Sequence, residues 1–307
     1  PYLVDAPDVL LPSRRGPICA VPSIVFGSMA NDGGHLLLDD AERTALLASE
    51  PQAEHWLRPF LGADEFINGR TRWCLWLVDC PPEVLRAMPN VRARVQGVKR
   101  HRDASSRAAT RSLAATPSLF GEIRQPAGRY LLVPRHSSER REIIPIGFLE
   151  PAVIVGDANL CVPDATVFHF GVLTSRMHMA WVKYVCGRLE SRYRYTNQIV
   201  YNNFPWPEVP TSKHADAIES AAQCVLDARA AFPGATLADL YDPLTMPPAL
   251  LKAHQKLDNA IDAAYGKKGA FKTDAERVAY LFELYQRLTS LLPAAQPRKK
   301  TRGRATA

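Results

Sequence analysis

The sequence predicts an α+β protein, in which a mixed domain with short antiparallel strands precedes a small helical domain. Short runs that are β-branched or alternate between apolar and polar residues recur from residue 129 to residue 155, with turn formers between them. One longer helical pattern covers residues 165–186. After Pro210 the chain becomes alanine-rich, and three successive segments place apolar residues at helical intervals.

Composition and charge narrow the class of protein. The chain has 307 residues, 47% of them hydrophobic and 22% charged, which is typical of one large or two modest globular domains. A formal net charge of +7 favours a polyanionic partner, although much of this excess could lie in tails. No apolar run has the length of a membrane span, and the six cysteines are scattered without zinc-finger spacing. We therefore expect a cytoplasmic protein with reduced, buried thiols and no metal site.

Composition shifts suggest four segments. Residues 1–34 hold many turn formers and predict a connecting arm, without core elements, that runs from an upstream domain. Since the chain begins with proline, we expect it to be a fragment of a longer protein. The mixed domain is expected over residues 35–208 and the helical domain over residues 209–293. Residues 294–307 are basic and poor in apolar residues, which predicts a disordered tail.

The beginning of the mixed domain predicts short elements. Asp39–Leu47 reads as a helix capped by Asp39 or Asp40. Residues 64–78 predict a turn at Asn68-Gly69 and then an apolar strand, whose Trp73 and Trp76 are expected in the core.

A cationic segment follows. Residues 91–111 hold seven cations and a single acid, Asp103. On a helix these cations form a ridge, for which phosphate contact and a merely solvated face are equally good interpretations. The candidates for DNA backbone contact in this ridge are Arg100, Arg102 and Arg107.

Two loop tips in the β-rich region carry further candidates. Residues 135–141 join two expected strands, and their hydroxyl and guanidinium groups suit phosphate contact. The alternative is an ordinary polar hairpin end. A second tip, residues 156–159, is able to lie near the first. The backbone-contact candidates here are Arg135, Ser137, Ser138, Arg140 and Arg141.

The helical pattern of residues 165–186 is expected to break near Thr174-Ser175, with Ser175 capping the second half and Gly187 stopping it. His169 and His178 have no metal-ligand companions at suitable spacing, so hydrogen-bonded structural roles are the better interpretation. In the helical domain, Pro248 is expected to open one helix, and residues 273–276 form a capping box for another.

The stretch from Gly187 to Pro207, GRLESRYRYTNQIVYNNFPWP, interleaves arginines with tyrosines around one acid. If it is extended, Glu190, Arg192 and Arg194 share a face, with successive members about 6–7 Å apart. Glutamate can accept from the cytosine amino group, and arginine can bind the O6/N7 edge of guanine. The stretch is therefore suited to reading base edges; the alternative is an edge strand whose charges face water.

No enzyme signature is present: the sequence lacks a Gly-rich nucleotide loop, a GxSxG elbow and an HExxH motif. We accordingly assign no catalytic residue and expect this segment alone to be inactive.

Long segments of the chain closely resemble the C-terminal part of MmeI-like enzymes, which are single-chain restriction–modification proteins, and of their methyltransferase relatives. The resemblance covers nearly the whole chain up to about Leu292 and is carried by EFINGRTRWCLWL, PSLFGEIRQP, RHSSERREIIPIGFL, HFGVLTSRMHMAWVKYVCGRLESRYRYTNQIVYNNFPWP and MPPALLKAHQKLDNAIDAAYG. It implies a DNA target recognition domain followed by a helical C-terminal domain. It also implies an upstream domain that uses S-adenosylmethionine to methylate adenine, so no cofactor is expected within this chain.

The resemblance also implies roles for individual residues. In this family, positions matching Glu190 and Arg192 are implicated in choosing one base pair, and those matching Arg194 and Ala158 in another. We therefore expect Glu190 and Arg192 to specify a C·G pair. The expected partners are double-stranded DNA and the upstream methyltransferase domain. The competing hypothesis is a protein-interaction or structural module whose basic face is only solvated.

Overall fold

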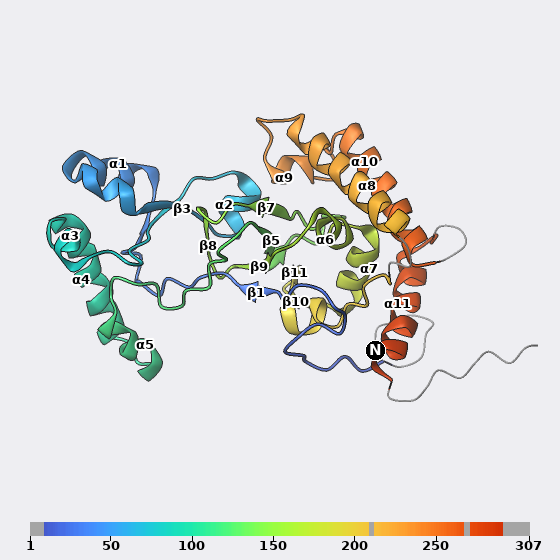
Figure 1. Cartoon of the computed structure of the whole chain (residues 1–307), viewed down its shortest axis with the longest axis horizontal. Helices are drawn as coiled ribbons and strands as arrows, with labels where there is room; N and C mark the ends of the chain where they lie inside the picture. Colours follow the sequence, from blue (N-terminus) through green and yellow to red (C-terminus); the bar gives the residue numbers. More distant parts are fainter. Residues whose placement is uncertain (1–8, 209–211, 267–270, 291–307) are drawn as a thin grey trace, which may run out of the picture.

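The computed structural model describes residues 9–208, 212–266 and 271–290. A small helix-rich lobe lies at one end of the long axis of the molecule, strands from several parts of the chain lie in the middle, and the C-terminal helices lie at the other end (Figure 1). The mixed α/β character with small sheets and a helical C-terminal part confirms the predicted fold class. None of the helices in these ranges is long and apolar enough to cross a membrane.

The first lobe surrounds a four-stranded sheet in the order β2-β4-β3-β8, in which only the β3–β8 pair is parallel. Trp73 and Trp76 are half-buried at the edge of its core rather than inside it. Asp39 caps the first helix with a complete capping box, as predicted. The elements of this lobe are β2 (Leu37–Leu38), α1 (Asp40–Ser49), a 3-10 helix (Pro51–Trp56), β3 (Leu57–Leu61), α2 (Ala63–Asn68), β4 (Trp73–Leu75), α3 (Pro82–Arg86), α4 (Pro89–Asp103), α5 (Ala108–Ser112), a second 3-10 helix (Leu113–Ala115) and β8 (Ile154–Val155).

The central sheet is antiparallel and has the order β1-β9-β5-β7, formed by β1 (Val25–Phe26), β9 (Asn159–Pro163), β5 (Tyr130–Pro134) and β7 (Gly147–Leu149). Strand β1 pairs with β9, and Ile24 before it is buried. The expectation that residues 1–34 contain no core element is therefore wrong for this part of the segment. Its apolar residues are covered by the same domain.

Two helices follow this sheet and lead to a hairpin. Helix α6 (Val167–Leu173) is separated from α7 (Arg176–Val185) by Ser175, whose hydroxyl accepts from the amide of His178, as predicted. Gly187 does not cap α7: the extended conformation of Cys186 ends the helix, and Gly187 is the first residue of the next strand.

The C-terminal part packs directly on these helices. It consists of α8 (Ser212–Ala230), α9 (Leu237–Leu240), α10 (Pro248–Ala264) and α11 (Asp274–Thr289). Helix α6 meets α8 at Gly171, where a Cβ atom would lie only 3.0 Å from the side chain of Ala222. Trp181 of α7 packs edge-on against Phe282 of α11, with ring centroids 5.5 Å apart. Pro248 opens α10 as predicted, and the predicted tail lies outside the described residues.

Candidate nucleic-acid interface

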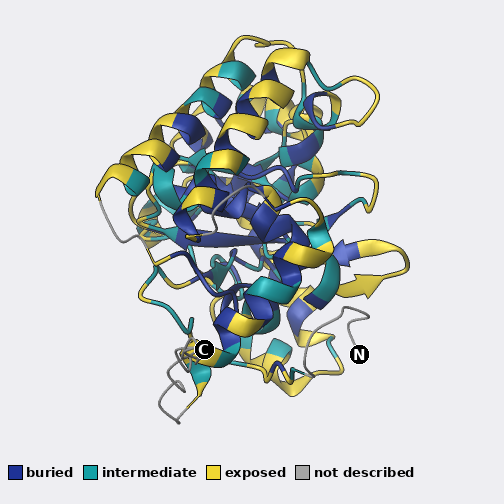
Figure 2. Cartoon of the chain, turned by 90° about the vertical axis from the view of Figure 1, so that its right-hand side faces the viewer, coloured by how far each residue is buried: buried dark blue, intermediate teal, exposed yellow. Residues whose placement is uncertain are grey.

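The stretch after α7 forms a β-hairpin that projects from the body of the chain (Figure 2). Its strands are β10 (Gly187–Leu189) and β11 (Arg192–Arg194), and β11 also pairs with β6 (His136–Ser137). Side chains alternate along β11 as expected for a strand: the two arginines are exposed, whereas Tyr193 and the following Tyr195 are buried. This alternation turns the arginines of β11 outward.

Glu190 lies in the two-residue turn of this hairpin rather than in the strand. Its φ angle is +56°, a left-handed conformation that is uncommon for a residue with a side chain. The turn still places the Glu190 carboxylate beside β11, where it accepts from Nη2 of Arg192 at 3.0 Å. The side chains of Glu190 and Arg192 remain 73% and 59% exposed. An ion pair this exposed contributes roughly 0–1 kcal/mol to stability. Either side chain can therefore leave this ion pair and bind a new partner at little cost.

Ala158 and Arg194 are brought close to each other by Arg135, although they are far apart in sequence. The amide of Arg135 donates to the carbonyl of Ala158 at 3.2 Å, and the amide of Tyr195 donates to the carbonyl of Arg135 at 2.7 Å. The second loop tip thus lies beside the first, as predicted. Arg194 pairs across the β6–β11 ladder with His136, the residue after Arg135. Burial, followed by the charge of Arg194, lowers the pKa of the Arg135 guanidinium.

His136 is a member of this cluster that the sequence did not reveal. It pairs with Arg194 across the β6–β11 ladder and is half-buried. Burial and the charges of Arg135, Arg194 and Arg192 lower its pKa, so the imidazole is neutral near pH 7. Its position follows from the β6–β11 pairing, which joins residues nearly sixty positions apart, and no local sequence pattern indicates such a pairing.

A hollow of about 600 Å³ lies beside the hairpin. It is lined by Glu190 and Arg192 of the hairpin and by Asp64 and Asn68 of helix α2. Four of the predicted backbone contacts, Ser137, Ser138, Arg140 and Arg141, also line it. These candidates are therefore brought together with Glu190 and Arg192, the candidates for base contact.

Ser137 differs from its neighbours in this loop. The residue is 3% exposed, and its hydroxyl is buried without a hydrogen-bond partner in the part of the chain that the structure describes. The structure does not support direct phosphate contact by this side chain.

The basic ridge on α4 and α5 is only partly available to DNA. Arg102 is fully buried, and its guanidinium donates to the carbonyls of Ala30, Asn31, Leu113, Thr116 and Leu119 at 2.8–3.0 Å. The expectation that Arg102 contacts the DNA backbone is therefore wrong: this cation fastens α4 to two loops. Arg100 and Arg107 are exposed and can still reach a phosphate.

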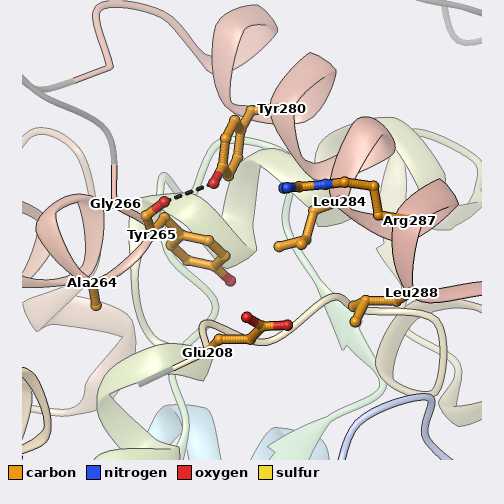
Figure 3. Close-up of a pocket in the computed structure, with 8 residues that line it drawn as sticks. All are labelled: Glu208, Ala264, Tyr265, Gly266, Tyr280, Leu284, Arg287 and Leu288. Atoms are coloured by element: carbon orange, nitrogen blue, oxygen red, sulfur yellow. Dashed lines mark hydrogen bonds between the residues drawn. The ribbon is translucent and has the colours of Figure 1, made fainter. Parts of the chain in front are cut away.

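A second hollow, of about 420 Å³, lies between α10, α11 and the segment that ends at Glu208 (Figure 3). The hydroxyl groups of its two tyrosines form hydrogen bonds within the fold. Tyr265 donates to the carbonyl of Pro205, and Tyr280 donates to the carbonyl of Tyr265. Segments outside the described residues adjoin it in sequence. Among the described residues, no group of three or more His, Cys, Asp or Glu side chains is placed to hold a metal ion.

The hairpin exposes a carboxylate and two guanidiniums on a mixed α/β domain, an arrangement that is typical of a nucleic-acid-binding module. Comparison with known proteins agrees with this class. The family model "MmeI, target recognition domain" matches residues 5–208, and "MmeI, C-terminal domain" matches residues 210–293. The chain therefore belongs to the MmeI family.

Two relatives illustrate the relationship. DNA methyltransferase A of Bacillus subtilis (strain 168) is 40% identical over 289 residues, which are 94% of this chain and 32% of the relative. A solved structure of the Type IIL restriction–modification enzyme MmeI in complex with DNA superposes with a TM-score of 0.91 at 48% identity, over 94% of this chain and 38% of that one. This chain thus spans about a third of the length of either relative.

Proposed function

We propose that this chain is the sequence-reading module of an S-adenosylmethionine-dependent adenine-N6 DNA methyltransferase of the restriction–modification type, acting in the cytoplasm on double-stranded DNA. The catalytic domain and its cofactor site would lie outside these residues. Family membership and the names of the two relatives support this assignment. A target adenine has to leave the base stack to be methylated, so the module that selects the site must hold the duplex in a fixed register.

The observation that carries the proposal is the exposed ion pair between Glu190, in the hairpin turn, and Arg192, the first residue of β11. A two-stranded ribbon fits the major groove of B-DNA. There the Glu190 carboxylate can accept from the amino group of cytosine, while Arg192 donates to the O6/N7 edge of the paired guanine. The two side chains begin 3.0 Å apart, which suits two bases that are themselves hydrogen-bonded to each other.

Arg194 and Ala158 would contribute to the choice of a second base pair. Both lie beside Arg135, on the side of the hairpin away from its turn. Arginine supplies a donor fork, and a small residue such as alanine leaves space for the base that the fork contacts.

Phosphate contacts would orient the duplex on this surface. Arg140, Arg141 and Ser138 line the hollow beside the reading pair. Arg100 and Arg107 lie on α4 and before α5, at the far end of the long axis from the C-terminal helices (Figure 1). A duplex that touches both regions would be held over a long stretch of its backbone. The C-terminal helices pack on α6 and α7 and would brace the methyltransferase domain.

Measurement of DNA binding over a range of salt concentrations tests this function. Phosphate contact predicts that the logarithm of the association constant falls linearly with the logarithm of salt concentration, with a slope of about −0.9 for each phosphate neutralised. Fluorescence anisotropy with a labelled duplex gives this slope. Absence of binding even at low salt would favour the competing hypothesis of a protein-interaction module.

A further inference from the structure

The reading hairpin carries an apolar side chain that its fold does not use. Leu189 is the last residue of β10 and is 49% exposed. It belongs to none of the hydrophobic clusters found among the described residues. A half-exposed leucine on a short projecting hairpin buries little apolar surface in the fold, and that surface is available to a binding partner.

The strand register places Leu189 on the base-reading face. Leu189 pairs directly with Arg192, and Gly187 pairs with Arg194. Directly opposed residues in an antiparallel pair project to the same side, with Cβ atoms about 4.5–5.5 Å apart. The other pair, Arg188 and Tyr193, therefore projects to the opposite side, where the Arg188 guanidinium lies 3.9 Å from the centre of the Tyr193 ring.

The chemistry of this face is thus mixed: two guanidiniums, one carboxylate and a single leucine. In the major groove, the group that an apolar side chain can distinguish is the C5-methyl of thymine, since the other base-edge groups there are hydrogen-bond donors and acceptors. We propose that Leu189 is a further specificity-determining residue, which takes the C5-methyl group of a thymine adjacent to the base pair read by Glu190 and Arg192. This inference rests on the proposed DNA-reading function.

Removing either contact partner should have the same effect. The Leu189→Ala variant, or replacement of that thymine by deoxyuridine, should weaken binding about fourfold, the effect of roughly one buried methyl group. The two changes together should cost no more than one alone. Leu251→Ala is the matched control, because Leu251 is 47% exposed but lies on α10, away from the hairpin.

A selection experiment tests the inference and defines the target site at the same time. The full-length protein that carries this chain selects binding sites from two randomised duplex libraries, one made with thymidine and one with deoxyuridine. For wild type and Leu251→Ala, we expect a thymine preference next to the C·G pair in the first library that disappears in the second. Leu189→Ala should lack the preference in both. Thermal unfolding checks that both variants fold like wild type.

Other outcomes distinguish the proposed role of Leu189 from the proposed DNA-reading function. An enriched motif with the same preference in both libraries, or in wild type and Leu189→Ala alike, would overturn the role of Leu189 and leave the reading function standing. Equal weakening of every duplex by Leu189→Ala would indicate a wedge between base steps and would also overturn methyl readout. Failure of the wild-type protein to enrich any motif would contradict the reading function itself.

Discussion

Nε2 of His178 lies 2.9 Å from the hydroxyl oxygen of Tyr195, and both side chains are buried. This hydrogen bond joins α7 to the residue that directly follows β11. The amide of Tyr195 also donates to the carbonyl of Arg135. Tyr195 therefore fixes the base of the β10–β11 hairpin on two sides, which limits the positions that Arg192 and Arg194 can take.

Loss of the Tyr195 hydroxyl should destabilise the fold. In Tyr195→Phe, the buried Nε2 of His178 loses its partner, so we expect the free energy of unfolding to fall by about 1–3 kcal/mol. Urea denaturation measures this change. Tyr184→Phe is the control, because the half-buried Tyr184 makes no hydrogen bond through its hydroxyl to another described residue. Equal losses in the two variants would contradict this account.

The contact between the two domains should depend on pH through Asp258. This carboxylate on α10 accepts from the amide of Arg176 at the start of α7, at 2.7 Å, and burial raises its pKa from 3.8 to about 6. The folded protein therefore binds this proton more tightly than the unfolded chain does. Its contribution to stability is complete below pH 3.8 and is lost as the pH rises through 6.

The variant Asp258→Asn retains an oxygen acceptor for the amide of Arg176 but does not ionise. Relative to wild type, its free energy of unfolding should rise by about 1–3 kcal/mol between pH 4 and pH 7. Urea titrations across this range measure the difference. If that difference between the two proteins were independent of pH, the assignment to Asp258 would be wrong.

Two arginines two positions apart on α4 should behave in opposite ways. Arg102→Ala removes a fully buried side chain and five hydrogen bonds to backbone carbonyls, so we expect a loss of stability of about 3 kcal/mol or more. Arg100→Ala should change stability by less than about 0.5 kcal/mol but reduce the salt slope of DNA binding by about 0.9. Denaturation and anisotropy on the same preparations measure both effects. An unstable Arg100→Ala, or an unaltered salt slope, would contradict these assignments.

The backbone conformation of the hairpin turn predicts that replacing Glu190 with glycine raises stability but removes base preference. Glu190 adopts a left-handed conformation, which costs a residue with a side chain about 1–2 kcal/mol and glycine almost nothing. Glu190→Gly should therefore raise the free energy of unfolding, by about 1 kcal/mol, while removing preference for the C·G pair. Denaturation and motif analysis give the two readouts. A destabilised variant that keeps its base preference would count against both arguments.

Local patterns predicted much of this structure. The alternation of side chains correctly placed Arg192 and Arg194 on one face of a strand, although Glu190 lies in the turn before it. The capping residues Asp39 and Ser175 were placed correctly. The spacing of residues along the sequence also indicates that Arg102 is buried. With Val91, Val95 and Val98 it completes an apolar stripe at helical spacing, which points its side chain into the fold.

Pairings between distant segments were not predictable in this way. Strand β1 pairs with β9, more than 130 residues later, and β6 leaves the expected hairpin connection to pair with β11. Strands of two residues carry no periodicity of their own, so their partners are set by the tertiary fold. The same limit explains why His136 and the proximity of Ala158 to Arg194 became apparent only in three dimensions.

The most direct test exchanges the charges of the reading pair. The double variant Glu190→Lys/Arg192→Asp is introduced into the full-length protein, and the methylated motif is determined on genomic DNA beside wild type and the control Arg188→Ala, whose side chain lies on the opposite face of the hairpin. Our account predicts that the C·G pair changes at one motif position, with every other position retained. An active double variant with an unchanged motif would contradict it and place base reading elsewhere in the chain.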